Sequence, residues 1–175
     1  MPFLADLAKI TEWLYLCGAS GVTKEKLRDA GITEVINCTL DVPNVDLPEI
    51  KTTRIKIDDS PHAPLRKHFE SVADHIDSLR SNGGKILVHC VAGVSRSVTL
   101  CIAYLMKYQK LTLVQANEEV INRRPIIRPN MGFWKQLIEY EKVLHGKNTV
   151  EMVPSPIGFI PDIYEDQTRN MWAFI

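Results

Sequence analysis

The stretch that most constrains the fold is KILVHCVAGVSRSVTLCIAYLMKY, residues 85–108. A short apolar run, Ile86–Val88, ends at His89 and Cys90, and a loop of small residues leads into a long apolar segment. A continuous apolar run of this length is typical of a parallel strand that is covered on both faces. The stretch therefore predicts a buried strand, a tight loop and a buried helix over residues 96–108.

Strand patterns and helix patterns alternate along the rest of the chain. The strand patterns cover residues 13–18, 32–38 and 52–57, and the helix patterns cover 23–31, 65–82, 112–123 and 131–144. Thr23 and Thr112 are placed to cap two of these helices at their N-termini. The alternation predicts an α/β fold whose central, mainly parallel (mixed) sheet has about five strands flanked by helices. In such sheets ligands bind at the carboxyl ends of the strands, which is where Cys90 lies.

Composition excludes several classes of protein. The 21 basic and 21 acidic residues give a net charge of +0, which argues against a nucleic-acid partner. The longest apolar stretch, residues 98–106, is far shorter than the roughly 20 residues of a membrane span. The four cysteines have no metal-ligand spacing, so we expect no structural metal. No cofactor is expected either. With no secretory signal visible, we expect a reducing intracellular compartment.

The chain divides by composition near residue 146. We expect residues 1–146 to form the catalytic domain and residues 147–175 to form a C-terminal extension. The extension contains three prolines and many large apolar residues, so it is too apolar for a typical disordered tail. We favour an extended arm that packs on the domain, and the alternative is a segment that binds a partner.

The loop between the buried strand and the buried helix has the features of an anion-binding site. The first N–H groups of a helix lack partners inside the helix, and the helix dipole is positive at that end. A tight loop there aims several N–H groups at one point, and Gly93 lets the backbone come close to a ligand. Arg96 can grip two phosphate oxygens at once. The residues expected to bind phosphate are Val91, Ala92, Gly93, Val94, Ser95 and Arg96.

Cys90 lies at the base of this phosphate-binding loop. Positive surroundings favour the thiolate, which is the reactive form, so we expect Cys90 to take a phosphoryl group and water to release it. Ser97 is placed to donate a hydrogen bond to the sulfur, and His89 is placed to order the loop from behind. A lone cysteine at the end of a strand is usually buried and inert. The fixed offsets of the five residue types favour the catalytic interpretation here.

HCVAGVSRS resembles the H-C-x-x-G-x-x-R-[ST] signature of the cysteine-based protein tyrosine phosphatases. AYLMKY and RPNMGFWKQLIEYE resemble the dual-specificity phosphatases, above all the small atypical subgroup, and the resemblance extends over almost the whole chain. One departure is Cys17, where many members have glycine. The resemblance implies a protein tyrosine phosphatase-like fold and hydrolysis of phosphotyrosine and of phosphoserine or phosphothreonine on proteins. It also implies signalling substrates such as MAP kinases or their upstream components.

The reaction also needs a proton donor for the leaving group. The loop KIDDSPHAPL, residues 56–65, offers Asp58, Asp59 and His62. In the resembling family an upstream loop aspartate has this role, and DSP aligns with that pattern at Asp59. Turn capping is the alternative use of both aspartates. For Asn130 we expect either a contact to a carbonyl of the phosphate-binding loop or an ordinary helix N-cap.

Several alternatives stay open. The same loop could serve a phosphatase for lipids, RNA ends or glycans, or a module that binds phosphate groups without turnover. Cys38 and Cys101 are candidate redox partners of an oxidised Cys90. We expect a cytoplasmic protein, with the nucleus and the mitochondrion as alternatives that the resemblance allows, and the sequence does not indicate an oligomeric state.

Overall fold

The centre of the molecule is a five-stranded sheet, seen in a computed structural model that describes residues 4–169. The strand order is β1-β2-β5-β3-β4, with bounds Ala8–Lys9, Leu14–Gly18, Ile86–Cys90, Glu34–Asn37 and Lys51–Arg54. Strands β2, β5, β3 and β4 run parallel, and β1 pairs with β2 in the antiparallel sense. The expected mixed, mainly parallel sheet is confirmed.

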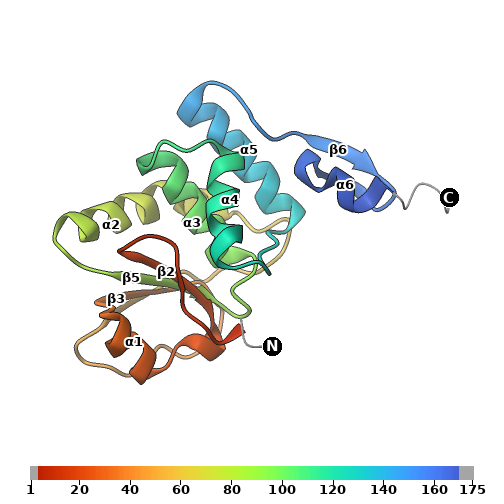
Figure 1. The fold of residues 1–175 in the computed structure, drawn as a ribbon. Helices are drawn as coiled ribbons and strands as arrows, with labels where there is room; N and C mark the ends of the chain where they lie inside the picture. Colours follow the sequence, from red (N-terminus) through yellow and green to blue (C-terminus); the bar gives the residue numbers. More distant parts are fainter. Residues whose placement is uncertain (1–3, 170–175) are drawn as a thin grey trace.

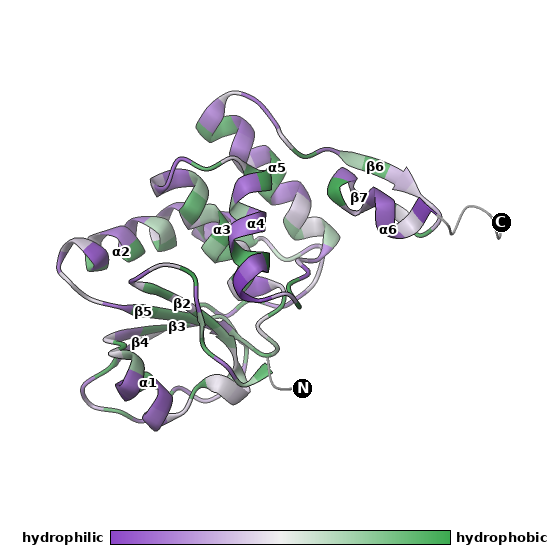
Figure 2. Ribbon diagram, viewed as in Figure 1, coloured by the Kyte–Doolittle hydropathy of each residue, from purple (hydrophilic) through white to green (hydrophobic). Residues whose placement is uncertain are grey.

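Helices cover both faces of the sheet, as Figure 1 shows. Helix α1 (Lys24–Ala30) lies on one face, and the opposite side carries α2 (Phe69–Ser81), α3 (Arg96–Tyr108), α4 (Leu113–Arg123) and α5 (Met131–His145). The central strands are largely hydrophobic, which is the green of Figure 2, because they are buried between the two helical layers. Within residues 4–169 no helix is both long and apolar enough to cross a membrane.

Capping residues fix the helix ends that the sequence predicts. The Thr23 side chain accepts the backbone N–H of Lys26, and Gly31 ends α1 in the left-handed region at a φ of 71°. Thr112 and Gln115 form the predicted capping box at the start of α4. These two helices therefore begin where local sequence alone requires them to begin.

Two predicted boundaries were wrong. The strand expected over residues 52–57 is shorter and starts earlier, at Lys51–Arg54, because its partner β3 ends at Asn37. The Asn37 carbonyl still accepts the N–H of Ile55, after which the chain leaves the sheet. The helix expected over residues 65–82 begins with a 3₁₀ turn at Leu65–His68 and becomes α-helical only at Phe69.

The C-terminal segment forms a hairpin rather than the expected extended arm. Strands β6 (Met152–Ser155) and β7 (Gly158–Pro161) pair antiparallel, followed by a 3₁₀ turn and the short α6 (Glu165–Thr168). Gly158 makes the hairpin turn possible, because its φ of 107° is one that residues with a Cβ rarely adopt. Residues 170–175 of the expected extension lie outside the described part of the chain.

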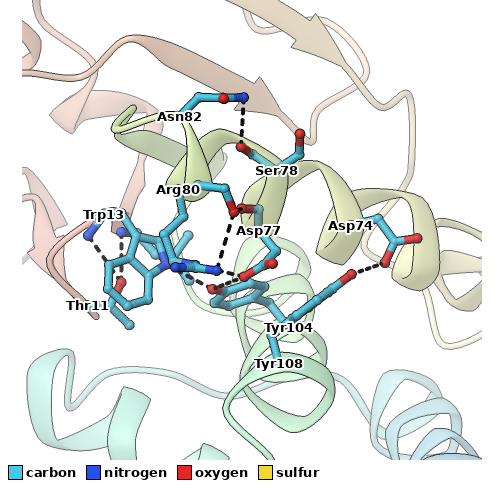
Figure 3. Close-up of polar contacts among 11 residues, drawn as sticks. Thr11, Trp13, Asp74, Asp77, Ser78, Arg80, Asn82, Tyr104 and Tyr108 are labelled. Carbon is cyan, nitrogen blue, oxygen red and sulfur yellow. Dashed lines mark hydrogen bonds and ion pairs between the residues drawn. The ribbon is translucent and has the colours of Figure 1, made fainter.

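A polar cluster ties the amino-terminal edge of the sheet to the helices (Figure 3). Trp13, just before β2, donates its indole N–H to the Tyr104 hydroxyl of α3 at 2.9 Å. The guanidinium of Arg80 lies 5.5 Å from the centre of the Trp13 ring and binds Asp77 at 2.8 Å. Because β2 and β5 are parallel, this cluster lies at the opposite end of the sheet from Cys90.

Candidate active site

The loop that joins β5 to α3 is pressed against the end of β2. The Gly93 φ of 66° is a left-handed value, and a Cβ there would lie 2.5 Å from the carbonyl carbon of Cys17 and from the nitrogen of Gly18. A Cβ on Gly18 would lie 2.9 Å from the Ala92 carbonyl oxygen. The N–H of Ala19 donates to the Val91 carbonyl at 2.8 Å. Glycine is therefore required on both sides of this contact.

Arg124 supports the loop from behind. It is only 2% exposed, its Nε donates to the Gly93 carbonyl at 2.7 Å, and its Nη2 donates to the Ala92 carbonyl at 3.1 Å. In a planar trans peptide the N–H points opposite to the C=O of the same unit. The N–H groups of Gly93 and Val94 consequently point away from Arg124, toward the side where an anion would bind.

Arg124 was not predicted from the sequence as part of the site. The sequence shows Arg124 only as the second of two adjacent arginines at the start of a proline-broken loop. Nothing in the local sequence shows that one of these two arginines is buried beneath a loop 31 residues earlier in the chain.

The cysteine thiol lies at the floor of this loop. Cys90 is 2% exposed, and its Sγ lies 3.1 Å from the Oγ of Ser97, within hydrogen-bonding distance. Ser97 is in the first turn of α3 and fully buried. The structure thus brings together the thiol and the hydroxyl that the sequence analysis paired.

His89 lies behind the loop, buried at 1% exposure. Burial lowers the pKa of His89, because removal from water disfavours the charged imidazolium. Its Nδ1 lies 3.2 Å from the Cys90 carbonyl, which can only accept, so Nδ1 carries the proton. A neutral imidazole therefore holds the backbone at Cys90.

Arg96 projects from the start of α3 and is 8% exposed. Its Nη1 donates to the Ile57 carbonyl at 3.1 Å, which ties the arginine to the segment after β4. Its Nε is buried and has no hydrogen-bond partner within residues 4–169. A buried guanidinium N–H without a partner is costly, and a bound phosphate oxygen would satisfy it.

Asp59 is held beside the loop by two donors. Its Oδ1 accepts the Ser95 hydroxyl at 2.8 Å and the Asn130 Nδ2 at 2.8 Å. The backbone N–H of Asn130 donates to the Ser95 Oγ at 3.0 Å and closes the network. Asn130 also caps α5, since its Oδ1 accepts the N–H of Phe133 at 2.9 Å. The cap was one of two expectations for Asn130; the other, a contact to a loop carbonyl, is replaced by the contact to Asp59.

The segment that carries Asp59 packs on the first turns of α5. A Cβ on Gly132 would lie 1.8 Å from the Pro61 carbonyl oxygen, so glycine is the residue that allows this approach. Gln136 donates to the Ala63 carbonyl at 2.9 Å and accepts the N–H of Arg66 at 2.7 Å. These anchors were not predicted from the sequence, because the partners of Gln136 lie about 70 residues away in the chain.

The other candidate residues lie outside this network. Asp58 accepts the backbone N–H of Asp59 at 2.8 Å, and the His62 side chain is exposed. Cys38 follows β3, beside β5, and Cys101 is in α3; burial raises the pKa of both thiols, and a redox role for either stays a prediction. Within residues 4–169 no three His, Cys, Asp or Glu side chains form a metal site.

Comparison with known proteins gives consistent matches. The family model "Dual specificity phosphatase, catalytic domain" matches residues 14–143. The chain is 49% identical to mouse dual specificity protein phosphatase 14, over 98% of this chain and 87% of that one. It is 48% identical to rat dual specificity protein phosphatase 18, over 97% and 84%. The crystal structure of human DUSP28 superposes with a TM-score of 0.76 at 34% identity, covering 79% of this chain and 94% of that one.

Proposed function

Because the chain belongs to the dual specificity phosphatase family, and is a dual-specificity protein phosphatase, we propose that Cys90 is its nucleophile and Asp59 its general acid. The Cys90 thiolate attacks phosphorus and forms an S–P bond while the P–O bond to the substrate breaks. Asp59 gives its proton to the departing phenol or alcohol oxygen. Water then attacks the cysteinyl phosphate, Asp59 takes up the proton of that water, and inorganic phosphate leaves.

The phosphate-binding loop stabilises the charge that develops on the transferring group. The N–H groups of residues 91–95 and the Arg96 guanidinium surround the three non-bridging oxygens, as preorganised donors do in other active sites. Ser97, at 3.1 Å from the sulfur, donates a hydrogen bond that stabilises the Cys90 thiolate when the S–P bond breaks. Neutral His89 keeps the Cys90 carbonyl in place.

One observation carries this assignment. A buried thiol, Cys90, and a buried arginine with an unsatisfied N–H, Arg96, flank one short loop whose N–H groups point away from Arg124. A structural thiol needs no such surroundings, since burial in an apolar core is enough to protect it.

The proposed substrates are phosphorylated signalling proteins such as MAP kinases or their upstream components. The surface of the phosphate-binding loop supports a protein substrate. Val91 is 51% exposed and Ala92 is exposed, so the loop presents small apolar groups to the substrate. Arg96 is the only cationic residue in residues 90–97, which disfavours highly charged lipid head groups.

The substrate class is tested with Cys90→Ser as a trap. Phosphotyrosine and phosphothreonine peptides from kinase activation loops, and phosphoinositides as competitors, are incubated with parent and variant. We expect the parent to hydrolyse the peptides and the variant to bind them without turnover. Faster hydrolysis of phosphoinositides than of any peptide would overturn the protein-substrate proposal.

We also propose that residues 1–146 form the catalytic domain and residues 147–175 its C-terminal extension, whose described part, residues 147–169, packs on the domain. Val150 and Ile160 are buried in the main core, and the Tyr164 ring contacts the Trp134 ring edge-on at 5.6 Å. The compartment proposed is the cytoplasm, because a reducing environment keeps Cys90 as the thiol that the reaction needs.

A further inference from the structure

Arg128 lies in the loop between α4 and α5, directly beside the phosphate-binding loop. Its backbone N–H donates to the Val94 carbonyl at 2.8 Å. Two residues further on, Asn130 contacts Asp59. Arg128 is therefore attached to the rim of the catalytic site, and its residue is exposed.

The C-terminal segment holds the Arg128 side chain in one orientation. The guanidinium carbon lies 4.3 Å from the centre of the Tyr164 ring, which is a cation–π contact. Nη1 donates to the Gln167 side chain at 3.0 Å. Tyr164 is itself buried against Trp134, so the aromatic platform is fixed to α5. Figure 1 shows α6 on the same side of the molecule as the start of α5.

The charge of Arg128 is not compensated by a carboxylate within residues 4–169. Most other exposed or partly exposed arginines bind one, namely Arg28 to Glu49, Arg66 to Glu139, Arg80 to Asp77, Arg123 to Glu119 and Arg169 to Asp166. Both partners of Arg128, a ring face and an amide, are neutral. Its Nε and Nη2 make no hydrogen bond in the described part of the chain, so they remain donors for an incoming anion.

We propose that Arg128 binds an oxyanion, a carboxylate or a second phosphate, on a substrate residue near the phosphorylated one. The C-terminal segment supports this site by orienting the guanidinium before substrate arrives, which lowers the entropic cost of binding. The planar fork of arginine suits both oxyanions. This inference rests on the proposed function, because it concerns the substrate of the same site.

The test compares phosphotyrosine peptides that differ at one flanking position. The series places neutral, acidic or phosphorylated residues on either side of the phosphotyrosine, and the readout is kcat/KM relative to the neutral peptide. We expect the parent to favour an acidic or phosphorylated flank by about fivefold, as for a well-formed exposed ion pair, and to lose this preference at high salt. The acidic and phosphorylated arms show which source of oxyanion the site prefers.

Variants assign the preference to Arg128. In Arg128→Gln the ratio of kcat/KM for the acidic or phosphorylated peptide to that for the neutral peptide should fall to about one. In Tyr164→Leu this ratio should lie between one and the parent value, because the aromatic ring that orients Arg128 is lost. Arg123→Gln, which removes a nearby arginine that binds Glu119, should keep the parent ratio. A parent ratio of one, or an unchanged ratio in Arg128→Gln, would overturn the proposal. Failure of the proposed catalytic function would differ, because then Cys90→Ser would hydrolyse the neutral peptide as fast as the parent.

Discussion

Asp59 and Asn130 are 71 residues apart in the chain, yet the Oδ1 of Asp59 lies 2.8 Å from the Nδ2 of Asn130. The Ser95 hydroxyl accepts the backbone N–H of Asn130, so its own proton is free to go to the same Oδ1. Both bonds therefore have a fixed direction, and Oδ1 is an acceptor. A proton that Asp59 delivers to a leaving group must then be on Oδ2.

Replacement of Asp59 by asparagine should affect substrates according to their leaving group. We expect kcat/KM for a phosphopeptide to fall about 100- to 1000-fold, because the leaving oxygen is no longer protonated. An activated aryl phosphate, whose leaving group needs no proton, should lose much less. Asp58→Asn is the matched control and should stay near the parent, since within residues 4–169 the Asp58 side chain hydrogen-bonds only to the N–H of Asp59. Equal losses of kcat/KM in Asp59→Asn and Asp58→Asn would contradict the role of Asp59 as the general acid.

Asn130→Ser separates the two contacts of Asn130. Serine is a good N-cap, so α5 should keep its start and the melting temperature should stay close to that of the parent. The donor to Asp59 is lost, and we expect kcat/KM for a poor leaving group to fall about tenfold. A parallel fall for an activated aryl phosphate would indicate general damage to the site and contradict a positioning role.

Arg124→Met should destabilise the protein and lower its activity together. The change leaves the Gly93 and Ala92 carbonyls without their donor, and we expect a loss of about 3 kcal/mol in the free energy of unfolding. Chemical denaturation measures this loss, and turnover of an aryl phosphate measures the effect on the loop. Arg123→Met, at the exposed neighbour, should cost at most about 0.5 kcal/mol. Similar costs for both variants would show that Arg124 does not support the loop.

Arg123 and Arg124 are neighbours in the sequence but differ in burial and in role, and this difference could not be predicted from the sequence around them. Alternation of apolar segments predicted the sheet and its flanking helices, and the fixed offsets of Cys90, Arg96 and Ser97 predicted their proximity, because strand, loop and helix are local. Arg124 and Gly132 act on segments far away in the chain, so no local pattern reveals them. The C-terminal hairpin was also not predicted, although Gly158 was a local signal for its turn.

The stability of the protein should fall as the pH drops below about 6.5, the ordinary pKa of histidine. Burial lowers the pKa of both His89 and His68, so the unfolded chain binds protons there before the folded protein does. Stability is then complete above the unfolded pKa and is lost as the pH falls toward the folded values. His89→Gln should flatten the dependence of the free energy of unfolding on pH below about 6.5, the ordinary pKa of histidine. If the free energy of unfolding of His89→Gln depends on pH as steeply as that of the parent, His89 does not cause the loss of stability at low pH.

The most direct test of the account is chemical identification of the covalent intermediate. The enzyme is mixed with an aryl phosphate, quenched in acid within the first turnover and digested for mass spectrometry. We predict one phosphoryl group on the peptide that contains Cys90, and none in Cys90→Ser. Phosphate on any other residue, or turnover that persists in Cys90→Ser, would contradict the central claim that the Cys90 sulfur accepts the phosphoryl group.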